Sequence, residues 1–179
     1  FTTDKERTFV SMNLLTVDHI TKVFTERELF RDASFYLQEG EKVGIIGING
    51  TGKSTLLKIM AGLTEPASGN IVRSGGLVIR YLPQMPEFDP EASVLTSVLS
   101  YAQIGSSHKK EEREVHEMWE LEASAKSMMT RLGIYDFEEK TGHLSGGQRK
   151  RLALVAVLLT PCDVLLLDEP TNHLDSEMA

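Results

Sequence analysis

A glycine-rich run at residues 47–55 has the residue types and the spacing to bind phosphate groups. Its letters, GINGTGKST, fit the pattern G-x-x-x-x-G-K-[ST], in which glycines let backbone N–H groups approach an anion closely. Lys53 would reach the β- and γ-phosphates of a nucleotide, and the Ser54 hydroxyl would contact Mg²⁺. The residues predicted to contact the nucleotide are Gly47, Ile48, Asn49, Gly50, Thr51, Gly52, Lys53, Ser54 and Thr55.

The segments on either side of this loop favour a phosphate site over an ordinary glycine-rich turn, which is the alternative interpretation. Residues 43–46 are apolar and partly β-branched, and they predict a buried parallel strand. Residues 56–62 have helical spacing and end in a glycine where a helix could stop. A strand, a glycine loop and a helix N-terminus with its positive dipole end together suit an anion.

Two adjacent acids follow the very apolar run 164–167 and form the second chemical signal. A buried strand that ends in acids, downstream of a phosphate loop, looks like a Walker B element. Asp168 would bind Mg²⁺, directly or through water, opposite Ser54. Glu169 would orient or deprotonate the attacking water and is the predicted catalytic residue. A merely polar strand end is the alternative, and the phosphate loop makes it the weaker one.

Composition predicts a globular protein and excludes several classes. The chain has 179 residues, of which 41% are hydrophobic and 25% charged, and this suits one domain with a sizeable core. The net charge of −7 argues against an indiscriminate nucleic-acid binder, and the single cysteine excludes an internal disulfide framework and fits the cytoplasm. The run 164–167 is far too short to span a membrane. Residues 1–11 are not a signal peptide, and we expect them to be a non-native leader before Met12.

The remaining pattern predicts strands and helices in an α/β arrangement. The expected strands are residues 14–17, 33–37, 71–72 and 77–82, the last two together forming a small antiparallel layer. After a proline-rich loop, the expected helices are residues 93–101 with Ser93 as N-cap, 107–132 and 148–159. The second helix should bury one stripe: Val115, Met118, Trp119, Ala125, Met129 and Leu132. Its charge cluster at 109–114 is interpreted as a solvated face rather than a binding site.

Two further segments carry a family resemblance. Residues 144–148, LSGGQ, match the signature sequence of ATP-binding cassette ATPases, and Gln84 falls where their glutamine loop lies. The resemblance implies an α/β P-loop NTPase of the ABC cassette type. It would have a mostly parallel core sheet, an antiparallel β subdomain and an inserted helical subdomain at about 91–160. Residues 12–179 would be one ATP-binding domain, incomplete at its C-terminus.

The resemblance also assigns roles to residues. In the family, the signature of one cassette completes the ATP site of another, so four residues would serve a partner's nucleotide: Ser145, Gly146, Gly147 and Gln148. Phe24 lies where the family stacks an aromatic ring on adenine, although a core phenylalanine is the competing interpretation. Gln84 would join Ser54 and Asp168 at the Mg²⁺ ion.

The run 168–175, DEPTNHLD, closely resembles the F subfamily of cassette proteins, which act in translation on the ribosome. In that subfamily one polypeptide joins two cassettes by a charged linker that reaches toward tRNA. The chain ends before the family's switch histidine, for which His173 is not a substitute, so we interpret it as a truncated first cassette. We expect it to bind ATP weakly and to hydrolyse it almost undetectably when alone.

The resemblance therefore implies a cytoplasmic, ribosome-associated factor, with the ribosome, tRNA and a second cassette as partners. It would bind Mg-ATP and, in a complete two-cassette protein, hydrolyse it to ADP and phosphate. Two alternatives stay open at this stage. One is the ATP-hydrolysing subunit of a membrane transporter, which would need membrane chains as partners, and the other is an ATP-dependent interaction module in DNA maintenance.

Overall fold

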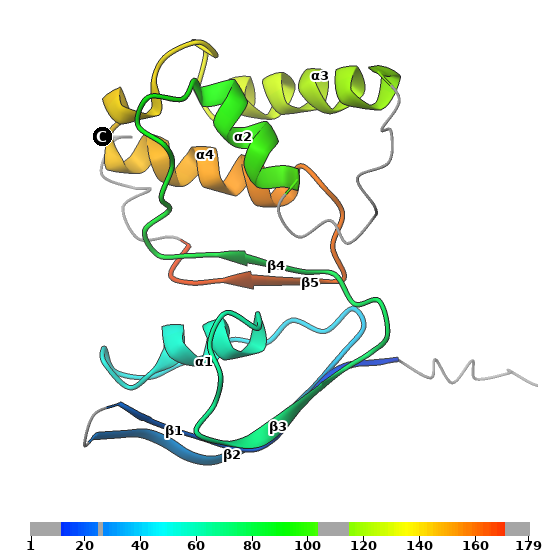
Figure 1. The fold of residues 1–179 in the computed structure, drawn as a ribbon, viewed down its shortest axis with the longest axis vertical. Coiled ribbons are helices and arrows are strands. Elements are labelled where there is room, and N and C mark those ends of the chain that lie inside the picture. Colours follow the sequence, from blue (N-terminus) through cyan, green and yellow to red (C-terminus); the bar gives the residue numbers. More distant parts are fainter. Residues whose placement is uncertain (1–11, 25–26, 104–114, 171–179) are drawn as a thin grey trace, which may run out of the picture.

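The structure, a computed structural model, describes residues 12–24, 27–103 and 115–170. The predictions for the leader 1–11, for the charge cluster 109–114 and for residues 171–175, including His173, lie outside these ranges. Figure 1 shows an upper layer of helices, a middle pair of strands, and a lower layer in which one helix lies on a curved sheet. No helix in the described ranges is long and apolar enough to cross a membrane.

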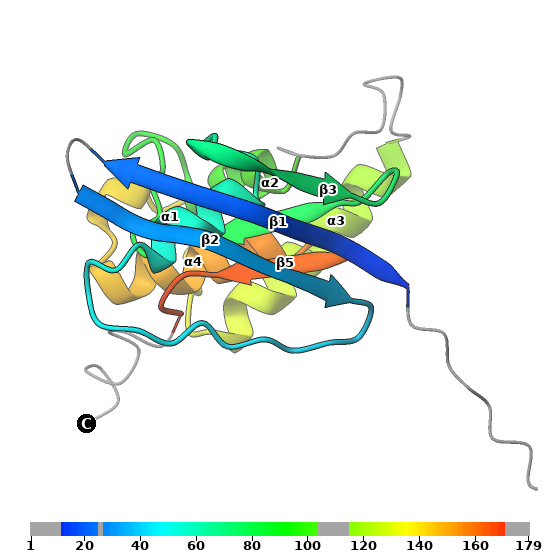
Figure 2. The same ribbon diagram turned by 90° about the horizontal axis from the view of Figure 1, so that it is seen from below.

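The lower layer is a three-stranded antiparallel sheet in the order β2-β1-β3. Its strands are β1 (Asn13–Phe24), β2 (Arg27–Gln38) and β3 (Ser68–Arg73), and Figure 2 shows β1 between the other two. The buried residues of β1 belong to the same apolar cluster as helix α1 (Lys53–Met60), and irregularities in the β1–β2 register interrupt strict alternation along the strand. The buried cluster on this side includes Leu15, Val17, Ile20, Leu57 and Ile59.

The middle layer is a parallel pair, β4 (Ile79–Leu82) and β5 (Val164–Leu167). Ile79 lies opposite Val164 and Leu82 opposite Leu167, so both strands end at the same edge. The predicted β5 is confirmed, but the prediction that segments 71–72 and 77–82 form one antiparallel layer was wrong. Each of the two segments pairs with a different sheet, because β3 has its hydrogen-bond partner in β1 and β4 has its partner in β5.

The predicted strand at residues 43–46 is a second correction. Residues 41–48 have no assigned secondary structure, and Ile46 is 97% exposed. Apolar, β-branched residues favour a strand, but a strand also needs a neighbour whose N–H and C=O groups complete the ladder. None of the strands in the described ranges pairs with this segment. The phosphate loop is therefore preceded here by chain without regular secondary structure.

The upper layer contains α2 (Val94–Gln103), α3 (Val115–Arg131), the short 3₁₀ turn η1 (Thr141–His143) and α4 (Gly146–Leu158). The predicted cap of α2 is confirmed, because the Thr96 backbone N–H donates to the Ser93 hydroxyl oxygen at 3.2 Å. The three helices pack around side chains with no exposed surface, among them Val98, Met129, Leu152 and Val155.

The predicted apolar stripe on α3 is correct only toward its C-terminal end. Ala125 and Met129 are fully buried against the other helices, whereas Trp119 is 76% exposed and Met118 is also exposed. Helical periodicity places all of these residues on related faces, but burial requires a facing element. The prediction of burial was therefore wrong for Met118 and Trp119, and the Val115 side chain lies outside the described part of the chain.

A narrow junction joins the helices to the parallel strands. A small cluster of Leu82, Ala153 and Val157 connects β4 to α4. Beside it, the buried Arg80 guanidinium donates to the carbonyl oxygen of Ala102 at 2.7 Å and to the hydroxyl of Thr160 at 2.5 Å. This cation lies at the C-terminal end of α2, where the helix dipole favours positive charge.

Candidate functional site

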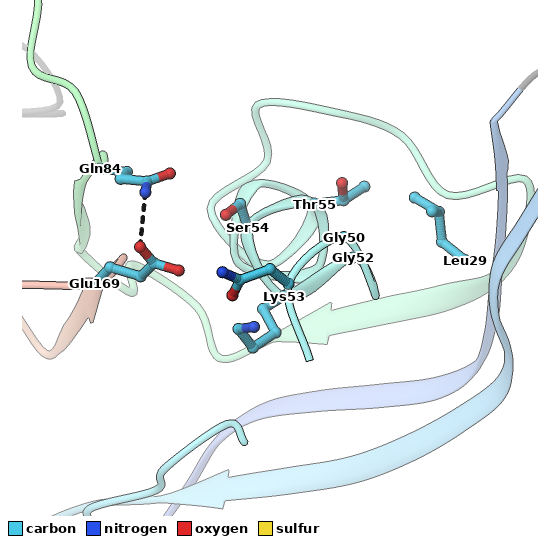
Figure 3. Close-up of a pocket in the computed structure, with 9 residues that line it drawn as sticks. Leu29, Gly50, Gly52, Lys53, Ser54, Thr55, Gln84 and Glu169 are labelled. Atoms are coloured by element: carbon cyan, nitrogen blue, oxygen red, sulfur yellow. Dashed lines mark hydrogen bonds between the residues drawn. The ribbon is translucent and has the colours of Figure 1, made fainter. Parts of the chain in front are cut away.

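A cavity of about 330 Å³ lies at the start of α1, beside the edge where β4 and β5 end. It brings the predicted phosphate loop together with two predicted residues that are far away in sequence, Gln84 and Glu169. Figure 3 shows these two side chains facing the loop from one side and Leu29 from the other. The lining residues are Leu29, Asn49, Gly50, Gly52, Lys53, Ser54, Thr55, Gln84 and Glu169.

The loop is held in shape by bonds from its own side chains. The Lys53 ammonium donates to the carbonyl oxygens of Gly47 at 2.7 Å and Ile48 at 3.0 Å. The Thr51 hydroxyl donates to the same Ile48 oxygen at 2.9 Å. These contacts curl residues 47–53 into a ring with a cation inside it. Such a ring of backbone with a fixed positive charge is suited to phosphate oxygens.

Gly52 is the position in the loop where the sequence requires glycine. Its φ is +98°, and it caps the N-terminus of α1. A Cβ atom at this position would lie 3.1 Å from the Leu29 Cβ and 3.2 Å from the Phe30 Cδ1. Both the backbone conformation and the close approach of β2 therefore exclude a side chain without local displacement.

Asp168, which follows β5, accepts hydrogen bonds from α1 and from β4. The Ser54 hydroxyl donates to Asp168 Oδ1 at 3.0 Å, and the Tyr81 hydroxyl donates to the other carboxylate oxygen, Oδ2, at 3.1 Å. Asp168 is only 3% exposed. Burial, and then the Asp168 charge, raise the pKa of the Tyr81 phenol, which therefore stays a donor. The predicted pairing of Ser54 with Asp168 is thus present in the geometry.

These oxygen atoms fit Mg²⁺. The described residues contain no cluster of three His, Cys, Asp or Glu side chains, which a protein-only metal cage would need. Mg²⁺ instead uses one or two protein oxygens together with water and phosphate oxygens. The Ser54 hydroxyl and the Asp168 carboxylate supply such a pair beside the cavity. Gln84 donates from its amide nitrogen to Glu169, so its amide oxygen is the group suited to a cation.

Glu169 is held at two points. Its Oε2 accepts a hydrogen bond from the Gln84 amide nitrogen at 2.6 Å, and its backbone carbonyl accepts one from the Lys150 ammonium. Its φ is +48°, which is uncommon for a residue with a side chain. This backbone conformation occurs where the chain leaves β5, and the Glu169 carboxylate there lines the cavity.

The signature residues lie elsewhere, at the N-terminus of α4. Ser145 caps this helix in a reciprocal box: the Gln148 N–H donates to the Ser145 hydroxyl at 3.2 Å, and the Ser145 N–H donates to the Gln148 side-chain oxygen at 2.8 Å. None of the four predicted signature residues, all within the described chain, lines the cavity. The structure does not bring them to this chain's own phosphate loop.

Phe24 is also separate from the cavity: it is 69% exposed at the end of β1, and its role stays a prediction. Three residues near the site were not predicted: Leu29, Tyr81 and Lys150. The glycine at position 52 could have indicated that another segment packs closely against the loop, as Leu29 does. Nothing local marks Tyr81 or Lys150, since both contacts depend on residues far along the chain.

Comparison with known proteins places this geometry in a family. The sequence profile of the ABC transporter family matches residues 30–172, which include the loop, the signature and the paired acids. The chain belongs to the ATP-binding cassette family. It carries an ABC ATPase domain, and the predicted P-loop cassette fold and ATPase class are confirmed.

Curated relatives of this cassette are named for translation as well as for transport. It is 35% identical to an uncharacterized ABC transporter ATP-binding protein, YfmR of Bacillus subtilis, over 93% of the chain and 30% of the relative. It is 34% identical to the energy-dependent translational throttle protein EttA of Escherichia coli K12, over 90% of the chain and 34% of the relative. It is 39% identical to the ribosome protection protein VmlR of B. subtilis, over 90% of the chain and 27% of the relative.

These relatives confirm the predicted resemblance to the F subfamily. The cassette spans about a third of the length of the curated relatives it matches. Among solved structures, a dimeric ATP-binding cassette in a post-hydrolysis state with ADP and phosphate superposes with a TM-score of 0.75. The identity is 23%, over 91% of this chain and 77% of that one, and this likeness shows the fold.

Proposed function

We propose that this cassette binds Mg-ATP in the cavity and hydrolyses it as one half of a two-cassette translation factor. The observation that carries the proposal is the cavity itself, which places Lys53 and Ser54 opposite Gln84 and Glu169. The first pair comes from a phosphate loop, and the second comes from the ends of two parallel strands. Together they offer groups for binding phosphate and for directing water to it.

Binding would start with the curled loop. A triphosphate competes with the carbonyls of Gly47 and Ile48 for the Lys53 ammonium, and a doubly charged phosphate is the stronger acceptor. Loop N–H groups at the start of α1 add donors and the positive end of the helix dipole. Mg²⁺, held by Ser54 and Asp168, would neutralise charge on the β- and γ-phosphates.

Hydrolysis would depend on the placement of the Glu169 carboxylate. Gln84 fixes one of its oxygens at 2.6 Å, and this restricts how the carboxylate can rotate at the cavity wall. A carboxylate held there can align a water molecule for in-line attack and accept its proton, a contribution of about 10²–10⁴ in rate. The remaining charge stabilisation comes from the loop amides and Lys53.

A second cassette is part of the proposal because the signature is not at its own cavity. Ser145 and the glycines after it form a helix N-terminus, a geometry that favours an anion. A partner cassette that brings its nucleotide to this helix would use Ser145 and Gly147, and would lend its own signature in return. The ribosome and tRNA are proposed partners because two relatives are named for translation and ribosome protection.

Lys53→Ala tests the binding site, with Lys58→Ala as the matched control. Both lysines lie on α1, but Lys58 is in its last turn, exposed and away from the cavity. Titration calorimetry with Mg-ATP should show that Lys53→Ala weakens affinity by about 100-fold or more, because a charge-assisted contact to phosphate is lost. Lys58→Ala should bind like wild type. Equal affinities for all three proteins would remove the assignment of the phosphate loop.

The ribosomal role needs a separate test, because a transporter subunit is the second candidate. The name of YfmR, a transporter ATP-binding protein, favours that candidate. We expect the full-length protein, trapped with ATP by Glu169→Gln, to co-sediment with ribosomes through a sucrose cushion and to be absent from washed membranes. Recovery with membranes and not with ribosomes would favour the transporter.

A further inference from the structure

Lys150 is a buried cation that the proposed mechanism does not use. It lies on α4, and only 4% of its surface is exposed. The described residues include two other buried charged side chains, Arg80 at the helix junction and Asp168 at the metal site. Burying an ammonium is costly unless it is hydrogen-bonded and close to opposite charge, so its location needs a specific reason.

The contacts of Lys150 supply this reason. Its ammonium donates to the backbone carbonyl oxygen of Glu169. Burial lowers the pKa of Lys150, while the nearby carboxylates of Glu169 and Asp168 raise it and so oppose that change. The cation therefore lies beneath the two acids that follow β5, bonded to the peptide group that joins Glu169 to Pro170.

The backbone at Glu169 has an unfavourable conformation that must be stabilised by its surroundings. With a φ of +48°, the Glu169 backbone is in the left-handed region, which costs a residue with a side chain about 1–2 kcal/mol. Such a conformation persists only where the surroundings impose it. A hydrogen bond from a cation to the carbonyl of the same residue is a strong constraint, since charge-assisted bonds are about twice as strong as neutral ones.

Lys150 also connects Glu169 to the signature. It lies on the same helix as the Ser145 cap, five positions further along, which corresponds to about 7.5 Å of helix rise. Residues this close on one helix keep a fixed spacing, so any shift of the Ser145 end of α4 would also shift the Lys150 ammonium.

We propose that Lys150 is a positioning residue: its ammonium holds the Glu169 backbone in the orientation that points the carboxylate into the cavity, and couples this orientation to the signature helix. The inference rests on the proposed function of Glu169. Lys150 acts through that residue and does not itself reach the nucleotide, since it is not part of the cavity wall.

The test uses Lys150→Met, which keeps length and removes the donor, and Lys150→Arg, which keeps a donor, both in the full-length protein. The matched control is Lys126→Met, which removes a bonded ammonium from α3 of the same helical layer. We expect Lys150→Met to lower kcat by about tenfold or more with a Mg-ATP Kd within about twofold of wild type. Lys150→Arg should restore turnover at least in part, and the control should match wild type.

The deciding measurement repeats Lys150→Met in a Glu169→Gln background. If Lys150 works through the carboxylate, the second substitution changes the residual rate by less than about twofold. A further loss equal to that in the wild-type background would overturn the inference, as would unchanged kcat in the single variant. Should Lys150→Met fail to fold, Lys150→Ala, which also removes the donor, carries the same comparison. Full turnover by Glu169→Gln alone would instead overturn the proposed role of Glu169, so the two failures are distinguishable.

Discussion

Replacing Gly52 by alanine tests the packing of the phosphate loop against β2. Two costs follow from the geometry. The first is backbone strain: at φ +98° a residue with a Cβ costs about 1–2 kcal/mol, reduced by about 0.4–1 kcal/mol because alanine restricts the unfolded chain. The second is steric, because the new Cβ would lie 3.1 Å from the Leu29 Cβ and 3.2 Å from the Phe30 Cδ1, and overpacking costs about 1–3 kcal/mol more.

Gly76→Ala separates these two costs. Gly76 also has positive φ, at +76°, but no atom lies within 4 Å of the place its Cβ would take. This control should therefore show strain alone, a loss of about 0.5–1 kcal/mol. In a domain of this size, each kcal/mol lowers Tm by about 2–4 °C. Gly52→Ala, which loses about 1.5–4 kcal/mol in total, should therefore melt about 3–16 °C below wild type, and Gly76→Ala about 1–4 °C below.

Nucleotide affinity gives the second readout of the same pair. Leu29 lines the cavity, so a Cβ on Gly52 shifts either this wall or the loop N–H groups. We expect calorimetry to show Mg-ATP affinity reduced by about tenfold or more in Gly52→Ala and within about twofold of wild type in Gly76→Ala. Equal melting temperatures and equal affinities for the two variants would refute the claim that the loop requires this contact.

Three further predictions concern chemistry, the helix junction and pH. Glu169→Gln in the full-length protein should keep ATP affinity but lower steady-state turnover by about 10²-fold or more, because the amide cannot accept the proton of water; a rate within about threefold of wild type would exclude Glu169 as the base. Arg80→Met should lower the free energy of unfolding in urea by about 3 kcal/mol, because the Ala102 carbonyl and the Thr160 hydroxyl lose a buried charged donor, and a loss below about 1 kcal/mol would contradict this. Hydrogen bonding to Asp32, and then the Asp32 charge, raise the pKa of His19 above its ordinary value of 6.5. The stabilisation that the His19–Asp32 pair provides is therefore fully present below about pH 6.5 and is lost as the pH rises through the folded-state pKa. Imidazole NMR titration should return this pKa toward 6.5 in Asp32→Asn, and an unchanged value would refute the pairing.

Sequence patterns predicted the parts of the site that depend on local geometry. The glycine spacing around Lys53 requires a tight turn, and the helix predicted at residues 148–159 overlaps α4, which Ser145 caps. The apolar run of β5 ends at the predicted acids. In each case the residues that determine the structure are neighbours in the chain, so a single segment contains the necessary information.

Predictions that needed a distant partner were less accurate. Residues 43–46 have strand composition and Trp119 has helical spacing, but within the described ranges no strand pairs with the first and no element covers the second. The strand that pairs with β4 could not be inferred, because the sequence of residues 79–82 is compatible with both parallel and antiparallel pairing. Contacts such as Tyr81 with Asp168 join positions 87 residues apart, which no local pattern encodes.

The split between the two main apolar clusters has a consequence for how the molecule opens. One cluster belongs to helices α2, α3 and α4 and the other to α1 and the strands, and in the described part of the chain the small Leu82 cluster lies between them (Figure 1). Native-state hydrogen exchange should then resolve two cooperative units with different opening free energies. The cavity lies at the boundary between the two units. Lys53 belongs to α1 in one unit, and Gln84 follows β4 just after Leu82, which packs against α4 of the other unit. A bound nucleotide would tie the two units together, and amides in both would become protected in parallel.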